Sequence, residues 1–476
     1  MNTYEKNYWS LYLDFLHDFQ KLNYRGFTIS YICHFPSLIR NNTVLWNDLY
    51  DEKFTKRLKN QVKEQKEIQE AFNNYIQSHK KKPLVKIKHG KVVVNYDTIL
   101  RFPVKTFDDY FDRSKTMIVM AGSKKNKKKS SSANTYNKML YNIPTKILSN
   151  YEINTKKAVI QLQNQARAMF KSYKGHHLYK DEKFQILFLK KITEIVNCIE
   201  QSILFLDDVS VSCIVFSNTH SYISRILALA AAEKGIPTIC MQHGIIGNEF
   251  GYIPKIAAIN AVYGNFEVRW YKKMGVPKNS LAIIGHPRFD QAFMSPKITR
   301  SKFYKQLGLD KSKKTVMLVV RGNRDIAKWR ILIRMISKKL KINILIKDFP
   351  SKNPHALTKE FPSVHSTQSY DLYDILPNVD LVISYPSTVA LEAMLLNKPL
   401  FILDKKLPSY TGYYNSLDEV VQKDPEKLGK LAVRYFNDPN WGIYVQEKKR
   451  NFLRNAYPDF SMSGKRLKRL INSLTG

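Results

Sequence analysis

Residues 211–244 read VSCIVFSNTHSYISRILALAAAEKGIPTICMQHG. This stretch opens with an apolar run typical of a buried strand and continues with a helical pattern that Gly235 and Pro237 end. It closes with a second apolar run, TICMQ, which leads into His243 and Gly244. A helix that joins two strands in this way predicts that the strands are parallel and lie in one sheet. The stretch therefore predicts an α/β fold.

The alternation of strands and helices continues along the chain. AAINAVYG (257–264), NFEVRWYKKMG and LAIIG extend the first series as strand, helix and strand. A second series begins at Thr315 and contains the strand patterns TVMLVV, NILIK, DLVIS and PLFIL, with helical patterns between them. Such alternation predicts a mostly parallel sheet covered by helices on both faces. We therefore predict two doubly wound, Rossmann-like α/β domains that are joined near residues 286–314 and face a cleft.

The remaining segments complete four predicted regions. KPLVKIKHGKVVVNYD (82–97) is typical of a hairpin, and the charged stretch from Arg57 is typical of an exposed amphipathic helix. The basic tail from Trp441 has a helical pattern and is expected to pack back across the first domain. The predicted regions are a helix-rich N-terminal extension (1–110), a Rossmann-like acceptor-side domain (111–290), a Rossmann-like nucleotide-donor domain (291–440) and C-terminal basic helices (441–476).

The composition limits the class of protein. A chain of 476 residues with 44% apolar residues has enough material for two hydrophobic cores. Its formal net charge of +37 indicates a polyanionic partner: nucleic acid, an anionic membrane surface or a phosphorylated substrate. The sequence contains no nucleic-acid-binding motif, and its basic residues are spread along the chain, so we expect no nucleic-acid partner.

The sequence predicts no membrane span, signal peptide or metal site. No window reaches the roughly 20 apolar residues that a membrane-spanning helix needs, and the N-terminal stretch lacks the pattern of a signal peptide. The four cysteines are scattered and no Asp-x-Asp triplet occurs, so we expect no metal and no cofactor. The expectation is a cytoplasmic protein that attaches peripherally to the inner face of the membrane.

Ligands of open α/β sheets bind beyond the carboxyl ends of the strands. Applied to both series, this rule selects polar residues that two facing domains would bring to one cleft. The selected set is cationic and rich in hydrogen-bond donors, which suits a diphosphate. It contains Asn218, Thr219, His220, His243, Gly244, His286 and Arg288 in the first domain, and Arg321, Gly322, Asn323, Arg324, Lys347, Asp348, Ser384, Ser387 and Thr388 in the second.

DLVISYPSTVALEA predicts a strand that ends at Ser384, a turn, and a helix that Ser387 caps. The start of such a helix offers unpaired N–H groups and a partial positive charge to a phosphate. Glu392 lies four residues after Thr388 on the same helix face, where a carboxylate can accept hydrogen bonds from ribose hydroxyls. A plain helix cap and a solvated glutamate fit the same spacing equally well.

His243 is the candidate catalytic base. An imidazole has an ordinary pKa of roughly 6.5, so it can take a proton or donate a hydrogen bond to phosphate at neutral pH. Gly244 permits the close approach of a ligand to the backbone. A packed histidine at a strand end fits the motif equally well. His220 and His286 are secondary candidates, and His286 with Arg288 also fits a simple interdomain turn.

Three motifs in this order, QHG (242–244), GHPRFD (285–290) and DILPNVDLVISYPSTVALEA, resemble the GT-B-fold transferases that build bacterial surface polymers. The resemblance is closest to the CDP-glycerol glycerophosphotransferase and capsule polysaccharide biosynthesis group, and it spans residues 211–404. It implies that His243 is a general base or phosphate ligand in the cleft. It also implies that the donor's nucleotide diphosphate contacts Ser384, Ser387, Thr388 and Glu392. The predicted donor site is completed by Gly244, Asn323 and the cations Arg288, Arg321 and Lys347.

Two departures from the family pattern bear on the substrate. Family members often have a lysine and then a His-Pro pair after the second strand of the nucleotide domain. This chain reads IKDFPSKNPH, with Lys347 in place, Asp348 where the histidine is expected, and His355 further along. Teichoic-type members usually have Trp-His-Gly-Thr where this chain has Gln-His-Gly-Ile. These departures favour a sugar-transferring relative.

The leading hypothesis is a transferase that moves a glycosyl unit from a nucleotide-diphosphate donor to a cell-surface polysaccharide acceptor. The acceptor would be a lipid-linked or growing chain of a capsule, teichoic-acid-like or spore-coat polymer. The alternatives are a CDP-glycerol-type glycerophosphotransferase, a nucleotide-sugar 2-epimerase of the same architecture, and a nucleic-acid-binding protein suggested by charge alone. The transferase hypothesis requires that His243 and the 384–388 turn lie together.

Overall fold

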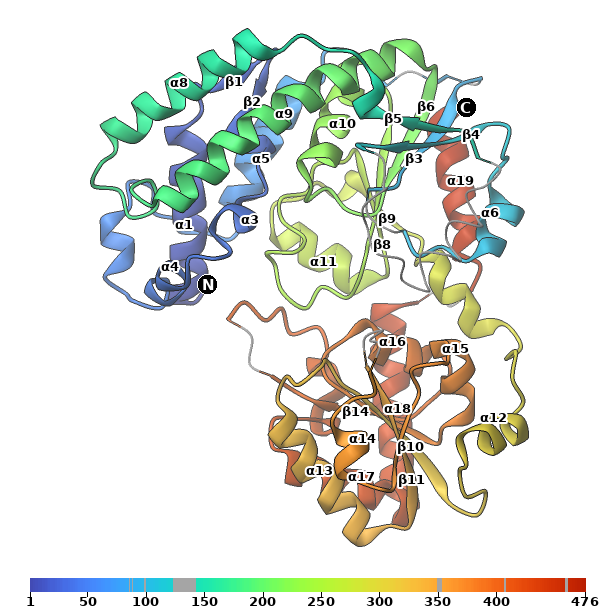
Figure 1. Ribbon diagram of the computed structural model, residues 1–476. Coiled ribbons are helices and arrows are strands. Elements are labelled where there is room, and N and C mark those ends of the chain that lie inside the picture. Colours follow the sequence, from blue (N-terminus) through green and yellow to red (C-terminus); the bar gives the residue numbers. More distant parts are fainter. Residues whose placement is uncertain are drawn as a thin grey trace.

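The computed structural model describes residues 1–476 except Val85, Lys88, 98–99, 123–142, 349–352, 406–407 and 459–460. Two α/β domains are stacked on each other, and a group of helices from the N-terminal region lies beside the first domain (Figure 1). Each domain is built on one parallel sheet. The predicted fold class, two Rossmann-like domains with an N-terminal helical region, is therefore confirmed.

The first domain has a 7-stranded parallel sheet with the strand order β5-β4-β3-β6-β7-β8-β9. The chain starts in the middle of the sheet at β3, runs out to β5, and from β6 runs to the opposite edge, so the order reverses between β3 and β6. Ligands of α/β proteins bind near such a reversal. The strands are β3 (Lys91–Asn95), β4 (Thr116–Met120), β5 (Thr145–Ile147), β6 (Val211–Phe216), β7 (Thr238–Met241), β8 (Ile259–Val262) and β9 (Leu281–Ile283), with α6 (Val104–Tyr110), α10 (Tyr222–Glu233), α11 (Asn265–Lys273) and the 3₁₀ turn η3 (Lys278–Ser280) between them.

Strand β3 lies in the middle of this sheet and corrects one prediction. It pairs in parallel with β4 on one side and β6 on the other, and Val93 and Val94 are fully buried. The predicted hairpin at 82–97 is wrong, because a valine run that is buried on both faces belongs to a central parallel strand. The lysines before the run imitate the polar positions of a hairpin. The first sheet thus begins before residue 110, the expected end of the N-terminal extension.

The N-terminal helices form an aromatic core that continues into the first domain. The buried residues of the long helix α9 recur every four positions, as in Phe184, Phe188 and Ile192, so one face of the helix is apolar. Phe15 of α1 meets Phe188 edge-on, with ring centroids 5.4 Å apart. Helix α9 also packs along α10, and it therefore couples the N-terminal helices to the first sheet.

The helix predicted from Arg57 is shorter and more buried than expected. It begins at Glu67 as α5, and its Ile68 and Phe72 are fully buried. These two side chains are four residues apart and share the face that packs into the aromatic core. The elements of this region are α1 (Thr3–Asp18), β1 (Asn23–Tyr24), β2 (Phe27–Thr28), α2 (Ile29–Ile32), α3 (Phe35–Ile39), α4 (Thr43–Asp48), η1 (Phe54–Arg57) and α5 (Glu67–Ser78), with η2 (Leu148–Asn150), α8 (Lys156–Ser172) and α9 (Glu182–Asp208) after β5.

The second domain has a 6-stranded parallel sheet with the order β12-β11-β10-β13-β14-β15. This is the strand order of dinucleotide-binding folds, and it reverses between β10 and β13. The strands are β10 (Lys314–Val319), β11 (Ile342–Lys347), β12 (Val364–Ser366), β13 (Leu381–Ser384), β14 (Leu400–Leu403) and β15 (Val421–Gln422). The helices are α12 (Arg300–Leu307), α13 (Ile326–Lys339), α14 (Leu357–Glu360), α15 (Leu372–Ile375), η5 (Leu376–Asn378), α16 (Thr388–Leu395), η6 (Asn415–Val420) and α17 (Pro425–Asn437).

The C-terminal tail returns to the first domain, as predicted. Helix α18 (Pro439–Ala456) belongs to the second domain, whereas α19 (Ser463–Thr475) packs on α6 and β6 of the first. The start of α19 is held by Asp290 of the 3₁₀ turn η4 (Pro287–Phe293), whose carboxylate accepts hydrogen bonds from the N–H groups of Ser463 and Gly464 at 2.8 and 2.9 Å. None of the helices in the described part of the chain has the length and apolar character that a bilayer span requires.

The GHPRFD motif contacts the chain where the tail returns to the first domain. The backbone N–H of His286 donates a 2.9 Å hydrogen bond to the hydroxyl of Tyr457, which lies just after α18. Gly285 has a φ of 71°, and a Cβ atom at this position would overlap the Tyr457 hydroxyl. A glycine is therefore required both by the backbone conformation and by the close approach of the tail.

The two domains also touch on the side away from the tail. Asn248 and Tyr410 form an isolated antiparallel bridge between the loop after β7 and the loop after β14. The side-chain amide of Asn2, at the start of α1, donates a 2.5 Å hydrogen bond to the carbonyl of Pro408. This contact lies at the left of Figure 1, beside the N-terminus, whereas α19 lies at the right. The domains are thus joined at both sides of their boundary.

Candidate functional site

His243 follows β7 at the carboxyl edge of the first sheet. Its imidazole stacks on Tyr252, with ring centroids 4.8 Å apart, and is open to solvent. Neither ring nitrogen forms a hydrogen bond with a described residue. The rest of the ring lies against protein, and this burial, followed by the charge of Arg101, lowers the pKa of His243 to about 4. The imidazole is therefore neutral near pH 7, and it has a lone pair free to accept a proton.

Gln242 fixes the direction of the loop that carries His243. Its amide Nε2 donates to the carbonyl of Gly244 at 2.8 Å and to Oε1 of Glu267 at 3.0 Å. Its Oε1 accepts a hydrogen bond from the N–H of Tyr263 at 3.1 Å, and burial raises the pKa of Glu267 to about 7. Gln242 was not among the predicted site residues; the signal that could have identified it is a polar residue between an apolar strand and a candidate base.

The loop after His243 touches the start of α16 in the second domain. The N–H of Ile245 donates a 3.3 Å hydrogen bond to Oγ1 of Thr388. Gly244 is confined between two hydroxyls, because a Cβ atom would lie 3.2 Å from Thr388 Oγ1 and 3.3 Å from Tyr252 Oη. His243 and the start of α16 thus lie at one interdomain boundary, as the transferase hypothesis requires.

Ser387 occupies the N-cap position of α16 but does not cap the helix. Its side chain accepts no hydrogen bond from the first turn. Its hydroxyl lies 3.0 Å from Oγ of Ser384 instead. The predicted position is confirmed, and the predicted capping hydrogen bond is wrong because the neighbouring serine competes for the hydroxyl. The first turn of α16 therefore has no side-chain cap, which leaves its N–H groups suited to an anion.

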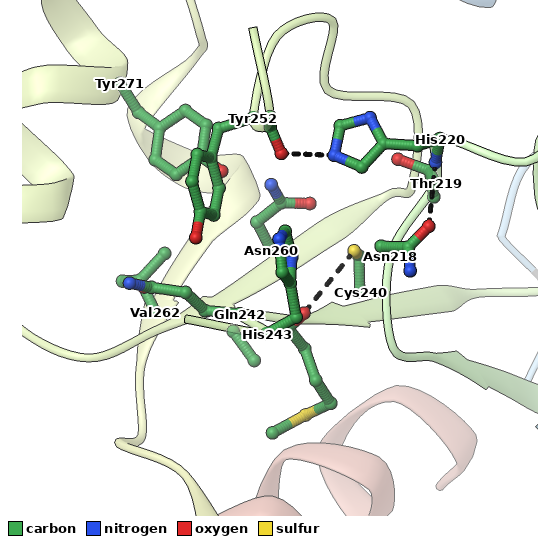
Figure 2. A pocket seen from close by; sticks show the side chains of 13 residues that line it. Asn218, Thr219, His220, Cys240, Gln242, His243, Tyr252, Asn260, Val262 and Tyr271 are labelled. Carbon is green, nitrogen blue, oxygen red and sulfur yellow. Dashed lines mark hydrogen bonds between the residues drawn. The ribbon is translucent and has the colours of Figure 1, made fainter. Parts of the chain in front are cut away.

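His220 lies beside His243, with ring centroids 5.8 Å apart. Its Nε2 faces the carbonyl of Gly251, and burial lowers the pKa of His220 well below its ordinary value, so Nε2 carries the only proton. Nδ1 of His220 and Oδ1 of Asn260 are buried and have no hydrogen-bond partner among the described residues. Both residues line a cavity of about 20 Å³ next to His243 (Figure 2), which is room for one water molecule.

Arg288 and Glu392, which were both predicted to contact the donor, contact each other. Nε and Nη2 of Arg288 donate to Oε1 and Oε2 of Glu392 at 2.9 and 2.5 Å. The hydroxyl of Tyr373 donates to Oε1 at 2.7 Å, and the Glu392 side chain is fully buried. The predicted ribose contact of Glu392 is therefore corrected, because its carboxylate is occupied by an arginine from the interdomain turn.

His286 is also a structural residue in this conformation. Its Nδ1 accepts a 3.1 Å hydrogen bond from the N–H of Arg288 and thereby caps η4. Burial, followed by the charge of Arg288, lowers the pKa of His286 to about 3. The residue is neutral and enclosed, so the interdomain-turn interpretation of GHPR holds for both residues.

Arg321 and Asn323 lie on the turn after β10 in the second domain. Between them, the N–H of Gly322 donates to Oδ1 of Asp348 at 2.9 Å, and the Gly322 carbonyl accepts from Nε2 of His355 at 2.9 Å. His355 lies further along the chain than the expected histidine, but its hydrogen bond to Gly322 brings it to the same turn.

Lys347 lies at the end of β11 but has a contact of its own. Its Nζ donates a 2.8 Å hydrogen bond to the carbonyl of Tyr370, and burial lowers the pKa of Lys347. Within the described residues no group of His, Cys, Asp or Glu is arranged to hold a metal ion. The predicted residues that gather around the start of α16 are His243, Gly244, Ser384, Ser387 and Thr388, whereas the polar groups of Arg288, Glu392, His286 and Lys347 are occupied by hydrogen bonds to other protein groups.

No protein-family model matches the chain. One curated relative is lipid-A-disaccharide synthase from Geobacter metallireducens, which is 30% identical over 165 residues that make up 32% of this chain and 42% of that protein. The matched segment of the chain therefore spans about two fifths of the length of this relative.

Solved structures with a similar fold include UDP-GlcNAc 2-epimerase from Neisseria meningitidis bound to UDP-GlcNAc. It is 12% identical, with a TM-score of 0.51 over 80% of this chain and 99% of that chain. A putative UDP-N-acetylglucosamine 2-epimerase from Listeria monocytogenes is 12% identical, with a TM-score of 0.51 over 80% of this chain and 96% of that chain. This likeness shows a GT-B-type fold of two facing Rossmann-like domains. The narrower resemblance to the CDP-glycerol group stays a prediction.

Proposed function

We propose that this protein is a glycosyltransferase that uses a nucleotide-diphosphate donor and a cell-surface polysaccharide acceptor. The observation that carries the proposal is the position of His243. A neutral imidazole with no hydrogen-bond partner among the described residues lies two residues from a contact with Thr388, at the uncapped start of α16 in the other domain. A candidate base and a candidate diphosphate site thus meet across the domain boundary.

The chemistry follows from this arrangement. His243 takes the proton of an acceptor hydroxyl, and the oxygen forms a bond to the anomeric carbon of the donor. The bond from that carbon to the phosphate oxygen breaks, and the diphosphate leaves with the electron pair. The N–H groups and positive dipole end of α16 stabilise the charge on the diphosphate. The Neisseria meningitidis enzyme of similar fold is bound to UDP-GlcNAc, which supports a donor of this type.

The pH dependence reports the protonation of His243. Because its pKa is lowered to about 4, the base form predominates above that pH and is lost as the pH falls through it. The acid limb of kcat/KM should therefore lie near pH 4. A bound diphosphate is negatively charged and raises the pKa of a nearby histidine, so the acid limb of kcat should lie at higher pH.

A transfer assay with His243→Ala tests the proposal. Loss of the base should lower kcat by about 10²- to 10⁴-fold, while binding of the nucleotide diphosphate, followed by thermal shift, should persist. His89→Ala is the matched control, because His89 is an exposed histidine on the surface of the first domain. Full transfer activity of His243→Ala would refute the assigned role.

The acceptor and the place of action rest on the charge of the chain. A protein with a net charge of +37 is attracted to an anionic polymer or an anionic membrane surface, so we expect the acceptor to be located there. We propose peripheral attachment at the inner face of the membrane, with a lipid-linked or growing polysaccharide as acceptor and no metal or cofactor. Sedimentation with vesicles tests this: the protein should bind anionic vesicles and not zwitterionic ones, with binding that weakens as salt increases.

A nucleotide-sugar 2-epimerase is the second candidate, because the solved structures of similar fold include such enzymes. An epimerase converts the donor sugar without any acceptor. Incubation of the protein with the donor alone, followed by analysis of the sugar, separates the two activities. A CDP-glycerol-type glycerophosphotransferase would instead transfer a phosphoryl-linked glycerol, which the same product analysis detects.

A further inference from the structure

A second cavity lies at the carboxyl edge of the second sheet, where the strand order reverses. It has a volume of about 150 Å³ and is bounded by the ends of β10, β13 and β14 and by the start of α13. A cavity of about this volume in another protein holds a benzene ring, so it has room for one six-membered ring. The residues that line it are Arg321, Arg324, Asp325, Lys328, Trp329, Tyr385, Pro386, Leu403, Asp404 and Lys405.

Asp404 is the unusual residue of this cavity. It follows β14 directly and is only 8% exposed. Its backbone N–H donates to the carbonyl of Gln422 at 2.8 Å, but its Oδ1 is buried and accepts no hydrogen bond from any described residue. A buried carboxylate oxygen without a hydrogen-bond partner is unfavourable for the folded protein. An ionised carboxylate only accepts hydrogen bonds, so the missing partner is a donor such as a hydroxyl or an amine.

The walls and the rim of the cavity indicate the rest of the ligand. Trp329 is 2% exposed and, with Tyr385, supplies aromatic surface for the apolar face of a ring. At the rim, Lys405 pairs with Asp325 at 3.2 Å, and Arg324 adds a further cation. The cavity therefore suits a ligand with hydroxyl groups at one end, an apolar face in the middle and a negative group at the other end. A sugar joined to a phosphate has these features.

The cavity is continuous in sequence with the proposed diphosphate site. Tyr385 and Pro386 line it, and the next residue, Ser387, is the N-cap of α16. A diphosphate at the start of α16 would therefore place the group attached to it at the mouth of this cavity.

We infer that this cavity holds the transferred glycosyl unit of the donor and that Asp404 positions it by accepting hydrogen bonds from its hydroxyl or amino groups. This inference rests on the proposed function. It specifies the substrate class as a neutral or amino-substituted hexose, because the carboxylate of a uronic acid would be repelled by Asp404. Asp404 is a positioning residue and takes no part in proton transfer.

The test compares nucleotide diphosphates with their sugar-linked forms by thermal shift and calorimetry. The probes are UDP, CDP, UDP-glucose, UDP-N-acetylglucosamine and UDP-glucuronate. In the unaltered protein at least one neutral or amino-sugar donor should bind more tightly than its nucleotide, and UDP-glucuronate should not. Asp404→Asn should weaken binding of the neutral donor by about 10- to 100-fold, as expected for the loss of a hydrogen bond to a charged group. The affinity for the nucleotide alone should be unchanged.

Two further readouts keep the test decisive. The melting temperature of ligand-free Asp404→Asn should equal or exceed that of the unaltered protein, because the variant removes an unpartnered buried charge. Asp418→Asn is the matched control: it makes the same change in the same domain, where Asp418 is exposed, is paired with Lys448 and does not line the cavity, and it should not alter donor binding.

Each outcome decides one question. A lower melting temperature of Asp404→Asn with unchanged donor affinity would show a structural role and overturn the inference. Binding of nucleotide diphosphates with no gain from any sugar, or a preference for UDP-glucuronate, would also overturn it and leave the proposed function standing. Failure of all nucleotides and donors to bind would refute the proposed function, and the inference with it.

Discussion

The ion pair between Arg288 and Glu392 makes a prediction that separates two roles for the same glutamate. Glu392→Gln keeps the shape of the side chain and removes its charge. In the structure this charge accepts three hydrogen bonds, at 2.9 and 2.5 Å from Arg288 and 2.7 Å from Tyr373, and the glutamate is 0% exposed. Burial lowers the pKa of Arg288, but Glu392 outweighs this and raises it. The arginine stays charged even when its partner is neutralised, because a guanidinium is not deprotonated in proteins.

The expected magnitude follows from the burial of the pair. Removal of one partner of a buried ion pair costs about 3–5 kcal/mol, mainly because the other charge is left unpaired. The pair joins η4 to α16, so the cost should appear as local opening of both elements. Hydrogen exchange of peptides that cover 287–293 and 388–395 should accelerate by roughly two to four powers of ten.

A control and a second variant make the assay specific. Glu360→Gln breaks a bidentate pair of the same kind with Arg330, but the Glu360 and Arg330 side chains are 33% and 37% exposed, so exchange should change little. The double variant Arg288→Met with Glu392→Gln removes both charges and should recover much of the loss.

The result that would refute this reasoning concerns the ribose. If Glu392 binds ribose hydroxyls, Glu392→Gln should weaken binding of a ribonucleoside diphosphate but not of its 2′,3′-dideoxy form. Exchange of 287–293 and 388–395 would then be unchanged. That combination would show that the carboxylate faces the ligand and that the ion pair does not hold the domains.

Two further predictions concern the interior of the protein. Burial, followed by the charge of Glu5, raises the pKa of Glu249 from 4.5 to about 8. Between these two pH values the folded protein holds a proton that the unfolded chain has released. The free energy of unfolding therefore falls by up to ~5 kcal/mol as the pH rises from 4.5 to about 8. In urea unfolding, Glu249→Gln should therefore be more stable than the unaltered protein at about pH 8 and equally stable near pH 4.5. If the unfolding free energies of the two proteins changed in parallel with pH, this prediction would be contradicted. Gly285→Ala should lower the melting temperature more than Gly308→Ala, because both glycines have positive φ but only the Gly285 Cβ would overlap Tyr457; equal losses would mean that backbone strain alone accounts for the effect.

Much of the fold follows from local pattern. The strands from β6 to β10 are apolar runs bounded by glycine, proline or polar turns, and the helices between them end at Gly235 and Gly275. Strand β3 was not predicted as a parallel strand because the lysines before it are also typical of an exposed hairpin. Its interior position in the sheet depends on pairing with β6, more than 100 residues away. The short strands β12 and β15 carry too few residues for a periodic pattern.

The site residues also fall into those that the sequence could predict and those that it could not. The rule that ligands lie beyond strand ends located His243 and the start of α16, because it needs only the end of each strand. It failed for Glu392, whose partner Arg288 is 104 residues away and cannot be identified from spacing. Asp404 follows the apolar run PLFIL directly, so the same rule applied to that strand would have included it. What the sequence could not reveal is that its Oδ1 is buried and has no partner.

The return of the tail has a mechanical consequence. The chain passes from the first domain to the second through η4 and comes back between α18 and α19, and Asp290 and Tyr457 tie these two passages together. We expect the two domains to move about this double connection and to separate first at the opposite side of their boundary, where Asn2 meets Pro408 and Asn248 meets Tyr410. Removal of the last helix would therefore loosen this connection and also uncover the part of the first domain's core that Leu467 and Ile471 bury.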